Sequence, residues 1–128
     1  MKNSFEEIHD LIEADYKCSE WAKNCDFKKR MKEFLDEVKE VEVELKNDDL
    51  TKLKDEMGDV LWDLIYAIYT GEKEGLFKSE EIFSGVIEKI KRRKPWALEG
   101  REVSKEEELK VWKEVKVKEK NGEYDLLR

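Results

Sequence analysis

Two pairs of acidic residues are candidates for chemistry, because both pairs have the same short spacing. Glu37 and Glu40 form the first pair, and Glu56 and Asp59 form the second. The two residues of each pair are three positions apart, so on a helix they would be neighbours on one face. Four clustered carboxylates would repel one another, whereas a divalent cation such as Mg2+ favours oxygen ligands. We therefore interpret the two pairs as ligands of a shared metal site.

Each pair also borders an apolar stripe at the same angle. At about 100° per residue, Glu37 and Glu56 lie at the edges of their stripes, and their partners lie one step further round. Two helices that pack by these stripes would bring the acids together, and the short link at residues 47–49 favours antiparallel helices. Ordinary solvated acids are the alternative, and a charged fraction of 46% supports it for any single glutamate. The stripes contain Met31, Phe34, Val38, Val41 and Leu45 before the link, and Leu50, Leu53, Met57, Val60, Leu61 and Leu64 after it.

The composition predicts one all-α domain. A length of 128 residues suits a single compact domain over residues 1–128, and 6 glycines and 1 proline favour helices. The net charge of -7 argues against general nucleic-acid binding. We expect no membrane span, because the most apolar run, residues 60–70, is short and contains Asp63, and no signal peptide, because residues 1–10 have no apolar region. Two cysteines without a C-x-x-C spacing predict reduced thiols in the cytoplasm.

The apolar periodicity predicts five helices joined by loops. Gly71 and Gly75 are interpreted as a helix stop and loop, and residues 17–26 as a loop or turn. Ser79 and Ser104 are predicted N-caps, the latter in a capping box with Glu107. The predicted helices cover approximately residues 4–16, 26–46, 50–70, 79–93 and 105–120.

The second half of the third predicted helix is apolar on two faces. Ile65 and Ile68 continue its core stripe, while Trp62, Tyr66 and Tyr69 form a roughly opposite face. A helix that is apolar on most sides must be buried on most sides, which a chain of this size can hardly achieve alone. We therefore predict a homo-oligomer, either a homodimer or a homotetramer, formed through this helix.

Several residues have two interpretations from the sequence. Asp63 lies one turn past Asp59, so it is either an extra ligand or substrate contact, or a solvated acid. Trp21 is either a core anchor, which composition favours, or a stacking platform for a nucleobase. Lys23 is most simply a solvated charge, and His9, the one histidine, is interpreted as a surface or cap residue.

The end of the fourth predicted helix is strongly basic. Lys89, Arg92 and Arg93 share one region of the helix, and cations are favourable at any helix C-terminus. The same residues also suit a clamp for phosphates, because the planar guanidinium group binds phosphate through two parallel hydrogen bonds. From the residues alone, the first explanation is favoured.

Several motifs together resemble one known family. Residues 36–40 are similar to its E-E-x-x-E motif and residues 56–59 to its E-x-x-D motif. Residues 58–95 match elements of the form G-D-L-L, E-E-G-x-F and K-x-x-R-R-x-P. A W-x-K element at residues 21–23 and a late W…K-x-x-E-K element at residues 112–120 extend the resemblance over about residues 5–120. The chain resembles the MazG-like nucleoside triphosphate pyrophosphohydrolases of the all-α NTP pyrophosphatase superfamily.

The chain departs from this family at three positions. Asp36 stands where the family has its first glutamate, so we give it no ligand role. Glu20 replaces the usual proline before the tryptophan, and Cys25 replaces a glutamine expected shortly after it. These departures leave the base selectivity open and leave the metal chemistry intact.

The resemblance implies a four-helix-bundle-like MazG fold with an additional C-terminal helix. It also implies Mg2+-dependent hydrolysis of nucleoside or deoxynucleoside triphosphates to the monophosphate and pyrophosphate, in nucleotide-pool cleaning, with Mn2+ as an alternative metal. By this resemblance, Glu37, Glu40, Glu56 and Asp59 are metal and catalytic residues, Lys89 is catalytic and contacts the triphosphate together with Arg92 and Arg93, and Trp21 and Lys23 lie near the nucleotide.

Two alternatives stay open. One is a related pyrophosphohydrolase with a dedicated substrate, such as phosphoribosyl-ATP or a pyrimidine dNTP. The other is an acidic helical module that acts only through protein contacts. The matched acid pairs and the basic helix end favour the enzyme.

Overall fold

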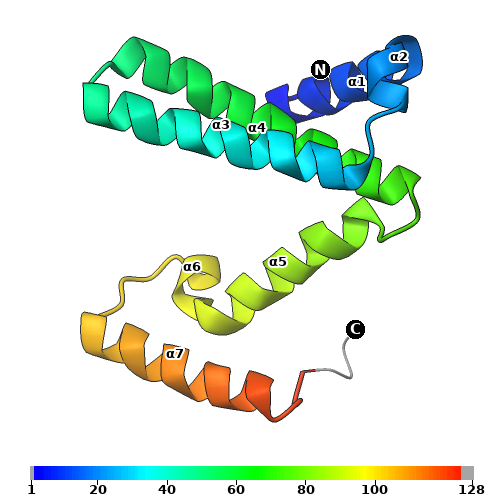
Figure 1. The fold of residues 1–128 in the computed structure, drawn as a ribbon. Coiled ribbons are helices and arrows are strands. Elements are labelled where there is room, and N and C mark those ends of the chain that lie inside the picture. The colour runs from blue at the N-terminus through cyan, green and yellow to red at the C-terminus, as the bar shows by residue number, and fades with distance from the viewer. Residues whose placement is uncertain (1, 125–128) are drawn as a thin grey trace. The chain divides into compact units, whose positions relative to one another are not determined.

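The computed structural model of the protein describes residues 2–124, which form seven helices and no strand (Figure 1). The predicted all-α class is therefore confirmed. Two short helices, α2 and α6, lie in segments that the sequence analysis treated as loops. No helix in this part of the chain combines the length and the apolar character needed to cross a membrane. The helices are α1 (Ser4–Cys18), α2 (Glu20–Lys23), α3 (Phe27–Asn47), α4 (Leu50–Lys73), α5 (Ser79–Arg93), α6 (Pro95–Glu99) and α7 (Lys105–Lys120).

The chain divides into two compact units just after Ser79. The first unit contains α1 to α4, and the second contains nearly all of α5 together with α6 and α7.

The first unit is organised by a hairpin of α3 and α4, which lie side by side and antiparallel (Figure 1). Asp26 caps α3 by accepting a hydrogen bond from the Lys29 backbone N–H, 2.8 Å away. Asp48 ends α3 in the left-handed region at φ 56°, and Asp49 caps α4. The chain therefore reverses within two residues, as the predicted link required.

The core of the first unit lies around the C-terminal half of α4. Ile65, Tyr66 and Tyr69 of α4 are buried with Ile12 of α1 and Ala22 of α2. The Tyr66 hydroxyl donates a 2.8 Å hydrogen bond to Asp15 of α1, and burial together with this contact raises the tyrosine pKa. Because α1 and α2 pack here, this is the end of the hairpin that is covered on more than one side.

The apolar stripes of α3 and α4 are only partly buried. Two helices packed side by side leave much of each circumference uncovered where no third helix joins them, so much of the stripe is partly exposed in this chain. Exposed apolar residues of the hairpin include Leu35, Val38, Val43, Leu45, Leu50, Met57, Leu61 and Leu64.

Gly71 does not stop α4, contrary to the prediction, because the helix continues to Lys73. Gly71 is buried, and a Cβ added to it would lie 2.3 Å from the ring atom Cζ of Phe77. The turn instead uses Gly75, whose φ of 77° is a conformation that glycine adopts without strain. Gly71 thus allows a close approach of Phe77, whereas Gly75 allows the change of direction.

The second unit is held by contacts between α5 and α7. Glu119 of α7 accepts hydrogen bonds from Arg92 Nε at 3.1 Å and from Arg93 Nη2 at 2.8 Å. Trp96 of α6 and Val115 of α7 are buried. Ser104 caps α7 by accepting from the Glu107 N–H, so the predicted helix start is confirmed.

Candidate metal centre

Three of the four predicted metal ligands converge in the α3/α4 hairpin. Glu37 of α3 and Glu56 and Asp59 of α4 each have a carboxylate oxygen within 4.8 Å of the other two. Glu37 and Glu56 are partly buried, and Asp59 is exposed. The antiparallel hairpin brings together residues about twenty positions apart in sequence. Three oxygen donors at this separation form a group of the kind that binds a hard divalent cation.

The electrostatics of this group favour a bound cation or proton. The pKa of Glu37 is raised to about 7, most strongly by burial, then by its contact with Glu56 and by the negative charges of Asp59 and Asp63. The group therefore does not carry its full negative charge at neutral pH without a compensating positive charge. A divalent cation would supply that charge and replace the proton.

Glu40, the fourth predicted ligand, is exposed and lies outside the group of three. Asp63 is partly buried, and its pKa is raised by burial and by the charge of Glu33, while Arg30 acts in the opposite direction. Asp63 also contributes to the raised pKa of Glu37. Asp63 therefore belongs to the same electrostatic cluster as the three converging carboxylates.

Arg30 was not among the residues predicted from the sequence, and it is the one charged residue of α3 that is buried. Its guanidinium carbon lies 3.5 Å from the centre of the Tyr66 ring and 5.0 Å from that of Trp21. A helical wheel contains the signal that could have found it. Arg30 precedes Glu37 by seven residues, so the two lie on nearly the same side of the helix.

Trp21 is 52% exposed, so the prediction from composition that it anchors the core is wrong. It lies on α2, a helix of only four residues, whose core contact is Ala22. Lys29 and Arg30 approach its ring to 5.2 and 5.0 Å. Lys23, at the end of the same short helix, is exposed. The indole ring is therefore partly accessible, as a stacking platform must be.

The three predicted phosphate contacts lie on α5, in the second unit. Lys89 is exposed. Arg92 and Arg93 both bind Glu119, and their side chains lie against the rings of Tyr124 and Trp112, respectively. The hydrogen bonds from Arg93, followed by those from Arg92, lower the pKa of Glu119 to about 2. The two arginines thus also have a structural role within the second unit.

Residues 26–98 match the family model for the MazG nucleotide pyrophosphohydrolase domain. This range contains the three converging carboxylates and the three predicted phosphate contacts on α5. The chain belongs to the MazG nucleotide pyrophosphohydrolase family. The MazG match begins after Trp21 and Lys23, so it does not cover these two predicted nucleotide contacts.

Two relatives of the chain are consistent with MazG membership. The crystal structure of a MazG-related protein from Thermotoga maritima is similar to this fold with a TM-score of 0.82 and 29% sequence identity. That similarity covers 87% of this chain and 97% of the other, and it supports the predicted MazG-like fold. The uncharacterized protein YabN of Bacillus subtilis is 31% identical over 88 residues. These residues are 68% of this chain and 18% of YabN, so the chain spans less than a fifth of that relative.

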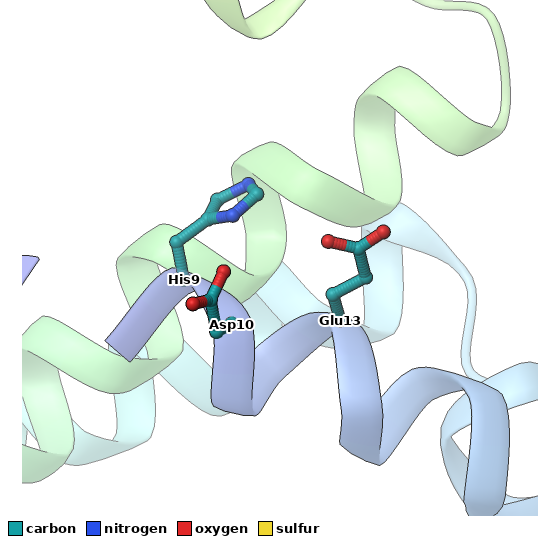
Figure 2. A group of neighbouring side chains, drawn as sticks. All are labelled: His9, Asp10 and Glu13. Carbon is teal, nitrogen blue, oxygen red and sulfur yellow. The ribbon is translucent and has the colours of Figure 1, made fainter. Parts of the chain in front are cut away.

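A second group of potential ligands lies on α1, outside the MazG match. Figure 2 shows the side chains of His9, Asp10 and Glu13, which have ligand atoms within 4.8 Å of one another. Each of these side chains already has a partner. Asp10 is paired with Lys2, Glu13 lies 3.5 Å from Lys17, and the partly buried His9 packs edge-on against Tyr69 with 6.0 Å between ring centres. We therefore assign this group to the packing and surface charge of α1.

Proposed function

We propose that this protein hydrolyses nucleoside or deoxynucleoside triphosphates to the monophosphate and pyrophosphate with the help of Mg2+. The observation that carries the proposal is the convergence of Glu37, Glu56 and Asp59 inside the MazG match. A cluster of carboxylates between two helices suits metal-assisted phosphoryl transfer. Removal of unwanted nucleotides from the pool would be the biological role.

The three converging residues would hold the metal, and their donor set fits Mg2+ because all three offer carboxylate oxygens. Mn2+ accepts the same ligands and would be an alternative metal. When bound, the ion would polarise the phosphoryl oxygens and lower the pKa of a water molecule that attacks phosphorus. Glu40, one turn from Glu37 on α3, would act in the outer part of the site as a further ligand.

The protein's own groups would share the remaining work. Lys89 is exposed and would meet the triphosphate as a point charge. Arg92 and Arg93 bind Glu119 through Nε and Nη2, so each retains its Nη1 group to donate to phosphate.

We further propose that the active form is a homo-oligomer. Met57, Leu61 and Leu64 on α4 are 54%, 46% and 39% exposed, close in sequence to the carboxylates. A contiguous apolar surface of this kind is typical of a contact between subunits. Size-exclusion chromatography with light scattering would test this proposal, and a mass of one chain at micromolar concentration would contradict it.

The proposed activity is tested by measuring pyrophosphate release from the common NTPs and dNTPs, with and without Mg2+. We expect release from at least one nucleotide that depends on the metal. Glu37→Gln and Asp59→Asn should lower the rate by about a hundredfold or more, because both remove a charged ligand. Glu42→Gln is the matched control, since Glu42 is exposed on the same helix and pairs with Lys46. Equal rates in all four proteins would contradict the assignment of the site.

A further inference from the structure

Arg30 has an unused hydrogen-bonding edge inside the first unit. It is 4% exposed, and its Nε and Nη2 atoms are buried without a hydrogen-bond partner among the residues that the structure describes. The positive charge of Arg30 is partly balanced by Asp63, since Arg30 opposes the rise in the Asp63 pKa. The Nε–H and Nη2–H groups of Arg30 nevertheless have no acceptor. Burying donors in this way is unfavourable, so their persistence in a native fold calls for a specific explanation.

The free edge has a definite geometry. Nε and Nη2 lie along the same edge of the planar guanidinium group, so their N–H bonds point in parallel toward a pair of adjacent acceptors. Two aromatic rings lie close to the group, since its guanidinium carbon is 3.5 Å from the centre of the Tyr66 ring and 5.0 Å from that of Trp21. Because the N–H bonds of a guanidinium group lie in its plane, an acceptor for this edge must approach in that plane.

The position of Arg30 relates it to the metal centre. Arg30 precedes Glu37 on α3 by seven residues, and Tyr66 follows Asp59 on α4 by the same number. Because the helices are antiparallel, both steps run in the same direction, about 10 Å along the hairpin. Asp63 lies between the two levels and interacts electrostatically with both. This separation is comparable with the span from the α-phosphate of a nucleotide to the far edge of its base.

We propose that Arg30 and Trp21 recognise the substrate's nucleobase, with Trp21 stacking on the ring and Arg30 donating two hydrogen bonds to adjacent acceptor atoms. This inference relies on the proposed function to place the triphosphate at the carboxylates. Guanine offers such a pair in O6 and N7, and cytosine offers one in O2 and N3. Adenine and uracil place a donor beside each such acceptor, so they cannot satisfy both N–H groups. A second phosphate-binding position is less suitable, because the partly exposed indole favours an aromatic ring.

Entry of the base requires a local movement, because the free edge is shielded from solvent in this structure. Trp21 is the neighbour suited to move. It is half exposed and lies on a helix of four residues, while Tyr66 on the other side of Arg30 is held in the core. The pocket would therefore open on the Trp21 side.

The first experiment compares kcat/KM for GTP, ATP, CTP and UTP with Mg2+ in the unaltered protein. We expect guanine over adenine and cytosine over uracil, each by about tenfold to a hundredfold, since a bidentate contact gives discrimination of that order. The comparison of GTP with ATP tests guanine as the recognised base, and the comparison of CTP with UTP tests cytosine. Equal values for all four nucleotides would overturn the inference, while the proposed hydrolysis would stand.

The second experiment uses Arg30→Lys, which keeps the charge over Tyr66 but removes the paired donors. We expect Arg30→Lys to raise KM for the preferred nucleotide until its kcat/KM matches that of the other nucleotides. The kcat values for the other nucleotides should be unchanged. Lys29→Met is the matched control, because Lys29 approaches the same Trp21 ring at 5.2 Å but is exposed. Circular dichroism would show that both variants fold. Unchanged discrimination in a folded Arg30→Lys protein would overturn the inference.

A binding measurement separates this inference from the proposed reaction. Tryptophan fluorescence is titrated with GMP, AMP, CMP and UMP, which cannot release pyrophosphate. We expect GMP to bind more tightly than AMP, or CMP more tightly than UMP, and Arg30→Lys to remove the difference. If no triphosphate is hydrolysed but this difference is present, the proposed function fails and the base pocket stands. Equal binding of the four monophosphates would overturn the pocket.

Discussion

Glu37 of α3 and Glu56 of α4 meet across the hairpin with carboxylate oxygens within 4.8 Å, and burial of Glu37 followed by this contact raises the Glu37 pKa. The carboxyl pKa of an unperturbed glutamate is about 4.3, whereas that of Glu37 is raised to about 7. The folded protein without metal therefore binds a proton at Glu37 more tightly than the unfolded chain does. Stability from this source is present at acidic pH and is lost as the pH rises through about 7.

Binding of Mg2+ should be coupled to release of the Glu37 proton. We expect the apparent affinity to increase as the pH rises through the pKa of Glu37 and to level off above it. Calorimetric titration in two buffers that differ in enthalpy of ionisation would measure the protons released. Glu37→Gln should remove this release, and a variant that still released the same number of protons would contradict the assignment.

Glu37→Gln should also stabilise the protein when no metal is present. The substitution removes a carboxylate that is desolvated and repelled by Asp59 and Asp63, so the free energy of unfolding above neutral pH should increase by about 1 kcal/mol. The same variant should lose the increase in melting temperature that Mg2+ gives the original protein. Thermal melts with Mg2+ or with a chelator would measure both effects. A variant that melts earlier than the original protein in the chelator would argue against repulsion at this site.

The ion pairs of Glu119 should control the acid stability of the second unit. The pKa of Glu119 is lowered to about 2. Its contribution to the free energy of unfolding is therefore fully present above the ordinary carboxyl pKa and is lost as the pH falls from there through about 2. Glu119→Gln should reduce the free energy of unfolding at neutral pH by about 1 to 3 kcal/mol, because two partly buried guanidinium groups lose their charged partner. The deficit should shrink as the pH is lowered. Glu114→Gln is the control, since Glu114 is exposed on the same helix and should change little.

The spacing of the acids in the sequence predicted that carboxylates from two helices would converge, because a local pattern decides it. Residues three or four apart on a helix share a face, and the Asn-Asp-Asp link limits how the two helices can return. Glu37, Glu56 and Asp59 therefore meet as expected. Glu40 differs because one further step round the helix is enough to move a side chain from the helix contact into solvent.

Burial was predicted less well, since it depends on which helices cover which part of the hairpin. A helical wheel shows that Leu61 and Ile65 share a face, but it cannot show that α1 packs near the second and leaves the first exposed. Trp21 was misjudged for the same reason, because a large aromatic residue is usually buried and α2 is too short to bury it. Arg30 was overlooked because a charged residue is not expected in a core.

Substitution by alanine at Gly71 and at Gly58, both on α4, should change the stability in opposite directions. In Gly71→Ala, the new Cβ would lie 2.3 Å from Cζ of Phe77, so the ring must move. That ring packs edge-on against Phe27 at 5.6 Å, at the start of α3, and the movement should therefore disturb the base of the hairpin. We expect the free energy of unfolding to fall by about 1 to 3 kcal/mol. A Cβ at Gly58 would meet nothing within 4 Å, so Gly58→Ala should instead stabilise by about 0.5 to 1 kcal/mol through helix propensity. Urea unfolding of both variants would measure the two changes, and equal stabilisation by both would show that Phe77 does not pack tightly on Gly71.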